Sequence, residues 1–195
     1  MIAIKDDIIP ELYQDRIYSM MTNTVFPWTF LQDVTYREQD VAKNINANAT
    51  GTTGFAHLFY DKQNEHESRY WDFLFPLFLT IVDNPNHQLL RAKGGLLLQT
   101  NIGYNHAHVD ADMPHTTTLY YVNDSDGDTF IFDQTNKSFD TNDEERIVKD
   151  DFTVKRQITP EKGKVIIFPG HYYHASSQPQ TSKYRIVCNI NFAEI

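Results

Sequence analysis

From residue 88 onward the sequence alternates with a period of two, and this feature most limits what the chain can fold into. Successive side chains of a β-strand point to opposite faces, so such alternation predicts strands. Turn signals rich in Asn, Asp, Pro and Gly separate the alternating segments. The expected strands cover residues 89–101, 115–123, 128–133, 152–158, 164–168 and 183–192. Short strands that follow two helices predict a mainly β fold, a jelly roll or sandwich braced by helices.

The first half of the chain shows helical periodicity instead. A helix is expected over about residues 9–22, with Pro10 at its first position, where the missing N–H costs nothing. A second helix is expected over about 67–83, in which Pro76 is predicted to kink or restart the helix. Between them, residues 26–31 form a short aromatic strand candidate.

Two polar stretches are expected to be loops that frame the entrance of a site. Residues 34–64 are rich in Asn, Thr and Gly, and they predict a mobile flap or a long surface loop. Residues 140–151 are acidic and predict an exposed loop. The length suits one domain over 1–195, with helical and mixed support in 1–88 and a jelly-roll core in 89–195.

Charge and composition exclude several classes of function. The formal net charge of −9 is poorly suited to binding phosphate backbones, so no nucleic acid partner is expected. Cys188 is the single cysteine, which excludes an intramolecular disulfide and fits a reducing compartment. No signal peptide is evident, and the longest apolar run, residues 73–82, is too short for a bilayer. We therefore expect a cytoplasmic protein without a membrane partner.

Two histidines and one aspartate predict a metal site. His108 and Asp110 are two residues apart, so on an extended strand an imidazole and a carboxylate point the same way. His174 follows a buried strand candidate and a Pro-Gly turn. Two imidazoles and one carboxylate on one face of an ion form the facial triad of non-haem Fe(II) oxygenases, which leaves other coordination positions open.

Arg185 and Tyr121 predict a site for an anion behind the metal. An inward-pointing arginine inside a β-barrel is costly unless it meets an anion, and a dicarboxylate would accept both N–H groups of the guanidinium fork. The phenol of Tyr121 would donate a second hydrogen bond to the same carboxylate. The alternative is a salt bridge at a sheet edge for Arg185 and ordinary sheet packing for Tyr121.

The order of these motifs resembles a known family. His-x-Asp is followed by Leu-Tyr-Tyr-x-Asn, Gly-Asp-Thr-x-Phe, Gly-x-x-x-x-Phe-Pro-x-x-x-x-His, and an Arg on a last strand that ends in Asn-Phe. Over residues 91–193 this order is similar to the prolyl-4-hydroxylase-like branch of the 2-oxoglutarate/Fe(II) dioxygenases. The chain also resembles small oxygenases of tailed phages, whose N-terminal halves carry a similar Phe-Pro-Trp segment.

The resemblance implies a double-stranded β-helix with the metal at one open end. The implied iron ligands are His108, Asp110 and His174. The implied partners of the 2-oxoglutarate C5 carboxylate are Arg185 and Tyr121, and the other end would meet Asn101 or Tyr104. The family often has a small hydroxyl residue where Val187 stands, so that hydrogen bond is expected either to be missing or to come from another residue such as Thr118 or Thr129.

The resemblance also implies a reaction. The cofactor would be Fe(2+), with 2-oxoglutarate and O₂ as co-substrates and succinate and CO₂ as products. Because Asp110 is present rather than a small residue, hydroxylation is favoured over halogenation. The substrate is expected to be a peptide or a small molecule, with peptidyl proline first and free amino acids or other metabolites next. The sequence does not address the oligomeric state.

The remaining histidines and the cysteine are expected to lie outside the metal site. His115 is placed in the mouth of the site, where it would meet substrate, and bends or turns are expected to direct His106 and His171 elsewhere. Surface positions are expected for His57, His66 and His87, and Cys188 is expected to be a buried structural thiol.

Two rival functions remain open at this stage. One is a cupin-type metalloenzyme that does not use 2-oxoglutarate, against which Arg185 and Tyr121 argue. The other is a non-catalytic jelly-roll module that binds a sugar or a protein. Release of succinate and stoichiometric binding of iron would separate these functions from a 2-oxoglutarate oxygenase.

Overall fold

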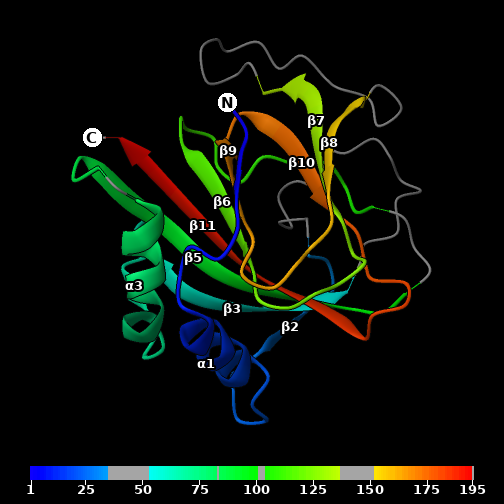
Figure 1. Ribbon diagram of the computed structural model, residues 1–195. Helices are drawn as coiled ribbons and strands as arrows, with labels where there is room; N and C mark the ends of the chain where they lie inside the picture. Colours follow the sequence, from blue (N-terminus) through cyan, green and yellow to red (C-terminus); the bar gives the residue numbers. More distant parts are fainter. Residues whose placement is uncertain (35–52, 83, 101–103, 137–151, 195) are drawn as a thin grey trace.

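The computed structural model describes residues 1–34, 53–82, 84–100, 104–136 and 152–194. Within these residues two antiparallel sheets carry most of the structure (Figure 1). The larger sheet has the order β1-β9-β6-β11-β5-β3-β2, and β4 pairs with β3 beside this path. The smaller sheet has the order β10-β7-β8. The mainly β, double-stranded β-helix fold expected from the sequence is therefore confirmed.

The expected helices and strands are present with bounds close to the predicted ones, and four further strands were not expected: Ala3–Lys5, Gly54–Asp61, His66–Glu67 and Tyr172–Ser176. In the larger sheet the strands are β1 Ala3–Lys5, β2 Thr29–Leu31, β3 Gly54–Asp61, β4 His66–Glu67, β5 His87–Leu98, β6 Thr116–Tyr121, β9 Val165–Pro169 and β11 Tyr184–Glu194. In the smaller sheet they are β7 Thr129–Thr135, β8 Val154–Ile158 and β10 Tyr172–Ser176. The helices are α1 Glu11–Met21 and α3 Trp71–Ile81.

The two helices pack on the face of the larger sheet that is turned away from the smaller sheet (Figure 1). Ile17 and Met21 of α1 and Leu74 and Leu77 of α3 are buried in one core with outward-facing residues of the sheet, among them Cys188. A second core lies between the sheets and consists of Leu119, Tyr121, Ile131, Ile158, Ile166, Phe168 and Val187. None of the helices in the described part of the chain has the length and apolar character needed to cross a membrane.

Both prolines of the helices behave slightly differently from the expectation. Pro10 precedes α1 instead of starting it, and its carbonyl oxygen accepts the N–H groups of Tyr13 at 2.8 Å and Gln14 at 3.1 Å. Pro76 lies inside α3, which continues through it from Trp71 to Ile81. Pro76 therefore does not restart the helix.

The expectation of a loop over residues 34–64 is wrong for its second part. Residues Gly54–Asp61 form β3, which pairs with β5 and with the edge strand β2. The polar tract before Gly54 hid the alternation of Phe55, His57 and Phe59, which is short but sufficient for a strand. Residues 35–52 of that stretch, and the acidic residues 140–151 for which an exposed loop was expected, lie outside the described residues.

Candidate metal centre

The backbone sets His108 directly opposite His174. The two residues form an antiparallel bridge in which each N–H donates to the other's carbonyl oxygen, both at 3.0 Å. Directly opposed residues of an antiparallel pair point their side chains to the same face. The two imidazole rings accordingly lie with their centroids 4.6 Å apart. Two histidines that are remote in sequence thus become neighbours without any help from a metal.

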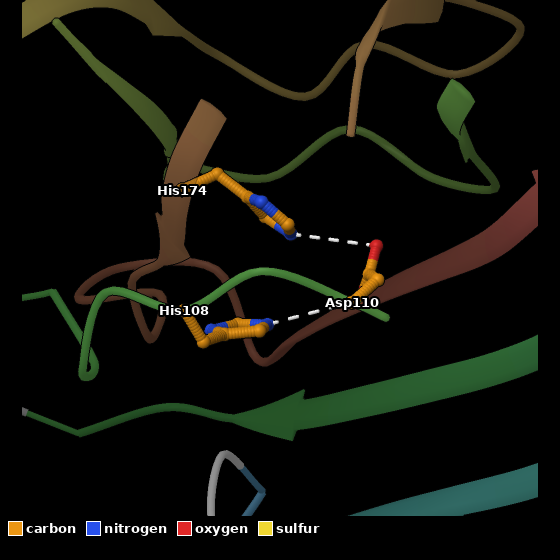
Figure 2. Close-up of side chains that lie close together, drawn as sticks. All are labelled: His108, Asp110 and His174. Carbon is orange, nitrogen blue, oxygen red and sulfur yellow. Dashed lines mark ion pairs between the residues drawn. The ribbon is translucent and has the colours of Figure 1, made fainter. Parts of the chain in front are cut away.

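Asp110 completes the group (Figure 2). Its Oδ1 lies 3.9 Å from His108 Nε2, and its Oδ2 lies 3.6 Å from His174 Nε2. Ligand atoms from the three residues all lie within 4.8 Å of one another. Among the described residues these three are the group of His, Cys, Asp and Glu side chains close enough to hold a metal ion. The predicted triad is brought together as expected.

Backbone carbonyl groups fix the tautomers of both histidines. Nδ1 of His108 donates to the carbonyl oxygen of His106 at 3.1 Å, and Nδ1 of His174 donates to that of Tyr172 at 3.4 Å. With the proton on Nδ1, the lone pair of each Nε2 faces Asp110. Metal-binding histidines usually have such a backbone partner, which orients the ring and raises its basicity.

The charges suit a cation. Burial lowers the pKa of His174 to about 4, so its imidazole is neutral at physiological pH. Burial would raise the pKa of Asp110, but His174, Arg91 and His108 attract the carboxylate and lower its pKa below the usual range. Because His174 is uncharged near neutrality, Arg91 and the hydrogen-bond donors carry most of this stabilisation. The site presents an ionised carboxylate and an unprotonated imidazole to the same point.

Arg185 lies on the same cavity as the triad and is buried. Its Nη2 donates to Thr129 Oγ1 at 2.9 Å, and Tyr121 Oη donates to the same oxygen at 2.7 Å. Within the described part of the chain no carboxylate forms an ion pair with this guanidinium, and its buried Nε has no hydrogen-bond partner. A buried cation without a carboxylate is costly unless an anion binds there.

Thr129, and not Thr118, is the hydroxyl residue beside the arginine. Thr118 alternates with Thr117 and Leu119 and points away from the cavity, which rules it out as a partner of the same carboxylate. Val187 lines the cavity, as expected from its place two residues after Arg185. Of the two alternatives left open by the sequence, the structure favours Thr129.

The remaining candidate residues lie elsewhere or are not described. Tyr104 packs against the rings of Phe130 and Phe132 and is not among the residues that line the cavity. Asn101 lies outside the described residues. Contact of either residue with 2-oxoglutarate remains a prediction.

His115 and His57 correct two expectations about histidines. His115 is buried against Gly170, its Nδ1 donates to the carbonyl oxygen of Met113 at 2.7 Å, and it does not line the cavity. His57 is not a surface residue. It lies on β3, next to the edge strand β2, where it donates to the carbonyl oxygen of Pro27 at 3.0 Å and accepts from Ser68 Oγ at 2.8 Å.

Four further polar residues contact Asp110 and were not singled out from the sequence: Arg91, Thr117, Asn189 and Asn191. A signal was present, because Asn189 and Asn191 share the strand phase of Arg185. Two asparagines in an inward phase of a buried strand need hydrogen-bond partners. What the sequence does not show is that the partner is the carboxylate of Asp110.

No protein-family model matches the sequence, and no curated protein matches it either. Solved structures do match. An oxidoreductase of the 2OG-Fe(II) oxygenase family from Burkholderia pseudomallei has a TM-score of 0.63 at 11% identity, covering 98% of this chain and 85% of that one. A Trichoplax adhaerens prolyl hydroxylase, in complex with a hypoxia inducible factor peptide, has a TM-score of 0.59 at 13% identity, covering 99% and 83%.

A prolyl-4-hydroxylase from Pseudomonas putida is also similar, with a TM-score of 0.55 at 13% identity over 100% of this chain and 92% of that one. The fold of the chain is therefore that of the 2-oxoglutarate/Fe(II) oxygenases. On this fold the chain places a His–Asp–His triad and a buried arginine on one cavity. The resemblance to phage oxygenases remains a prediction.

The donor set fits ferrous iron and a dicarboxylate. Two neutral imidazoles and one carboxylate are the ligands of a non-haem Fe(II) site with open positions. The unpartnered buried Nε–H of Arg185 and the hydroxyl group of Thr129 can donate hydrogen bonds to a carboxylate in the same cavity. The arrangement suits a co-substrate that reaches from a metal to a guanidinium.

Proposed function

We propose that the chain is an Fe(II)- and 2-oxoglutarate-dependent dioxygenase that hydroxylates its substrate and releases succinate and CO₂. The observation that carries this proposal is Arg185. A metal triad alone is also compatible with a cupin-type metalloenzyme. A buried guanidinium that shares the cavity with the triad, and has no carboxylate partner among the described residues, calls for an anionic co-substrate.

Each residue has a distinct role in this proposal. His108, Asp110 and His174 bind iron. The guanidinium of Arg185 binds the C5 carboxylate of 2-oxoglutarate, and Thr129 donates a hydrogen bond to it once its own proton is turned toward the ligand. Tyr121 donates to Thr129 Oγ1 and thereby fixes the direction of that hydroxyl. When bound, the iron and 2-oxoglutarate supply the oxidising chemistry.

The chain's own residues control water and charge. Leu119 and Val187 line the cavity between the metal triad and Arg185, and they give this path an apolar wall. Apolar lining strengthens the pairing of Arg185 with a carboxylate because it keeps water out. Asp110 is held ionised by its neighbours, so no proton has to leave it before a cation binds.

Peptidyl proline is our first proposal for the substrate, and free amino acids or other small metabolites are the second. The support is the fold, which is shared with prolyl hydroxylases of which one is in complex with a peptide. The Burkholderia pseudomallei relative has the fold without a substrate in its name, so the fold leaves the substrate class open.

The direct test is a panel of proline peptides, free amino acids and small metabolites. For each compound, formation of succinate is measured with Fe(II), 2-oxoglutarate and O₂. We expect at least one compound to give succinate in proportion to hydroxylated product, and we expect His174→Ala to abolish both. If His174→Ala retains turnover, or if wild-type protein never consumes 2-oxoglutarate, the proposal fails.

A further inference from the structure

A row of three polar side chains crosses the larger sheet beneath Asp110. Asn191 of β11 is paired with Arg91 of β5 on one side and with Thr117 of β6 on the other. Directly paired residues of neighbouring antiparallel strands face the same way. Asn189 lies one inward position before Asn191 on β11, and all four residues reach the carboxylate of Asp110.

The donors are distributed unevenly over the two oxygens of the carboxylate. Oδ2 accepts from Asn191 Nδ2 at 2.9 Å, from Asn189 Nδ2 at 3.1 Å and from Thr117 Oγ1 at 3.2 Å. Oδ1 accepts from Asn189 Nδ2 at 3.1 Å and from Arg91 Nη2 at 3.3 Å. The amide of Asn189 is shared between the two oxygens, so only Oδ2 has two donors of its own.

The lone pairs of the carboxylate limit what each oxygen can still bind. Each oxygen of an ionised carboxylate has about two lone-pair sites. Thr117 and Asn191 occupy both sites of Oδ2, whereas Oδ1 has one long hydrogen bond from Arg91 in addition to the shared amide. Oδ1 is therefore the oxygen with capacity for a cation. Oδ1 lies 3.9 Å from His108 Nε2 and Oδ2 lies 3.6 Å from His174 Nε2, so the hydrogen bonds, and not the distances to the imidazoles, distinguish the two oxygens.

We propose that Thr117 and Asn191 are positioning residues that hold Oδ2, so that Asp110 binds the metal through Oδ1 alone. This inference rests on the proposed function. It adds that the chain limits how many coordination positions of the metal its own aspartate occupies. Carboxylates bind ions through one or both oxygens, and nothing in an aspartate itself decides between the two. Here the sheet decides, because the row of polar residues holds one oxygen.

Binding of Asp110 through a single oxygen determines how many coordination positions of the metal stay open. An octahedral ion bound by two imidazoles and one carboxylate oxygen keeps three positions, enough for a chelating 2-oxoglutarate and one more molecule. An Asp110 that used both oxygens would leave two positions. A chelating 2-oxoglutarate would then occupy both remaining coordination positions, and none would be left for O₂.

A purely structural role for the row is the alternative. Thr117 is 0% exposed and Asn191 is 1% exposed, and buried polar groups need partners wherever they lie. A structural role predicts that removal of the two donors costs stability and leaves the coordination of the metal unchanged. The number of waters on the bound metal separates the two explanations, because stability does not affect it.

The test uses Mn(II), which prefers the same kind of ligands and is stable in air. Broadening of its electron paramagnetic resonance lines by ¹⁷O-water counts the water molecules on the ion. We expect wild-type protein to hold three waters, and one after addition of 2-oxoglutarate. The double variant Thr117→Val with Asn191→Leu keeps the approximate shapes of both side chains but removes the two donors that Oδ2 does not share with Oδ1. We expect it to hold one water fewer in each state.

The matched control is Thr118→Val, the same kind of substitution at the neighbouring residue of β6, which points away from the cavity; it should leave the wild-type water counts unchanged. Asn191→Leu alone serves if the double variant does not fold, as judged by circular dichroism, and it should lose the same water. The inference is overturned if the Oδ2 variants keep the wild-type counts, or if wild-type protein already lacks one water. A wild-type protein that binds no Mn(II) would instead refute the metal site and with it the proposed function.

Discussion

At the scale of single residues, Arg185 has the least ordinary environment. It is 2% exposed, and burial lowers its pKa from the usual value for an arginine. Its contacts are a threonine hydroxyl and the face of Tyr121, whose ring centroid lies 5.6 Å from the guanidinium carbon. A carboxylate that binds beside this buried guanidinium would stabilise it. The cavity that Arg185 shares with His108 and His174 offers the position for such a carboxylate.

Replacement of Arg185 by Met tests this role. Met fills a similar volume without a charge, so the variant should fold and should bind Mn(II) as the wild type does. Loss of two charge-assisted hydrogen bonds should weaken 2-oxoglutarate binding by about 100-fold or more. Isothermal titration of 2-oxoglutarate into the Mn(II)-loaded proteins measures the change. An affinity within about threefold of the wild type would remove Arg185 from the co-substrate site.

Cys188 gives a second prediction at this scale. The thiol is 1% exposed, and burial raises its pKa to about 12. Thiol reagents attack the thiolate, which is scarce here and shielded by the core. We expect no reaction of the native protein with a disulfide reagent over minutes, and reaction of one thiol after unfolding in guanidinium. Fast labelling of the native protein would show that this part of the core opens readily.

At the scale of elements, both described helices and the six longest expected strands follow from periodicity. Four strands were missed, and two of them, β1 and β4, are only three and two residues long. β3 follows a polar tract that dominated the composition of its neighbourhood, and β10 is a five-residue strand directly after a Pro-Gly turn. His174 lies on β10. The sequence therefore predicted this residue as a metal ligand without predicting the strand that carries it. Short strands are defined by their partners across the sheet, and the local sequence does not contain those partners.

The packing of α1 on the sheet can be tested with two substitutions in that helix. Ile17 is 0% exposed and lies in the core shared with α3, whereas Leu12 is 66% exposed. Ile17→Ala should lower the free energy of unfolding by about 2–5 kcal/mol because it leaves a cavity. Leu12→Ala should change it by no more than about 0.5 kcal/mol. Urea unfolding followed by circular dichroism gives both values. Equal effects would mean that α1 does not bury the face described here.

At the scale of the whole molecule, the site depends on contacts between segments far apart in the chain. The sequence predicted that the triad and Arg185 share one site, because motif order and strand phase are local properties. The contact of Arg185 and Tyr121 with 2-oxoglutarate remains a prediction, and Tyr121 donates to Thr129 in the structure. The restraint on Asp110 was not predicted, because it requires the register of β5, β11 and β6, which aligns Arg91, Asn191 and Thr117 in one row. His115 shows the limit of placing a residue from its position beside a turn, because the tertiary contacts set the direction of its side chain.

The central claim is that two imidazoles and one carboxylate bind a single ferrous ion, and anaerobic titration with Fe(II) tests it most directly. We expect wild-type protein to retain about one equivalent of iron per chain after desalting. His174→Ala should retain almost none, because only two of the three ligands remain, while the Leu12→Ala protein should behave as the wild type. Wild-type protein without stoichiometric iron, or a His174→Ala variant that keeps it, would contradict the account.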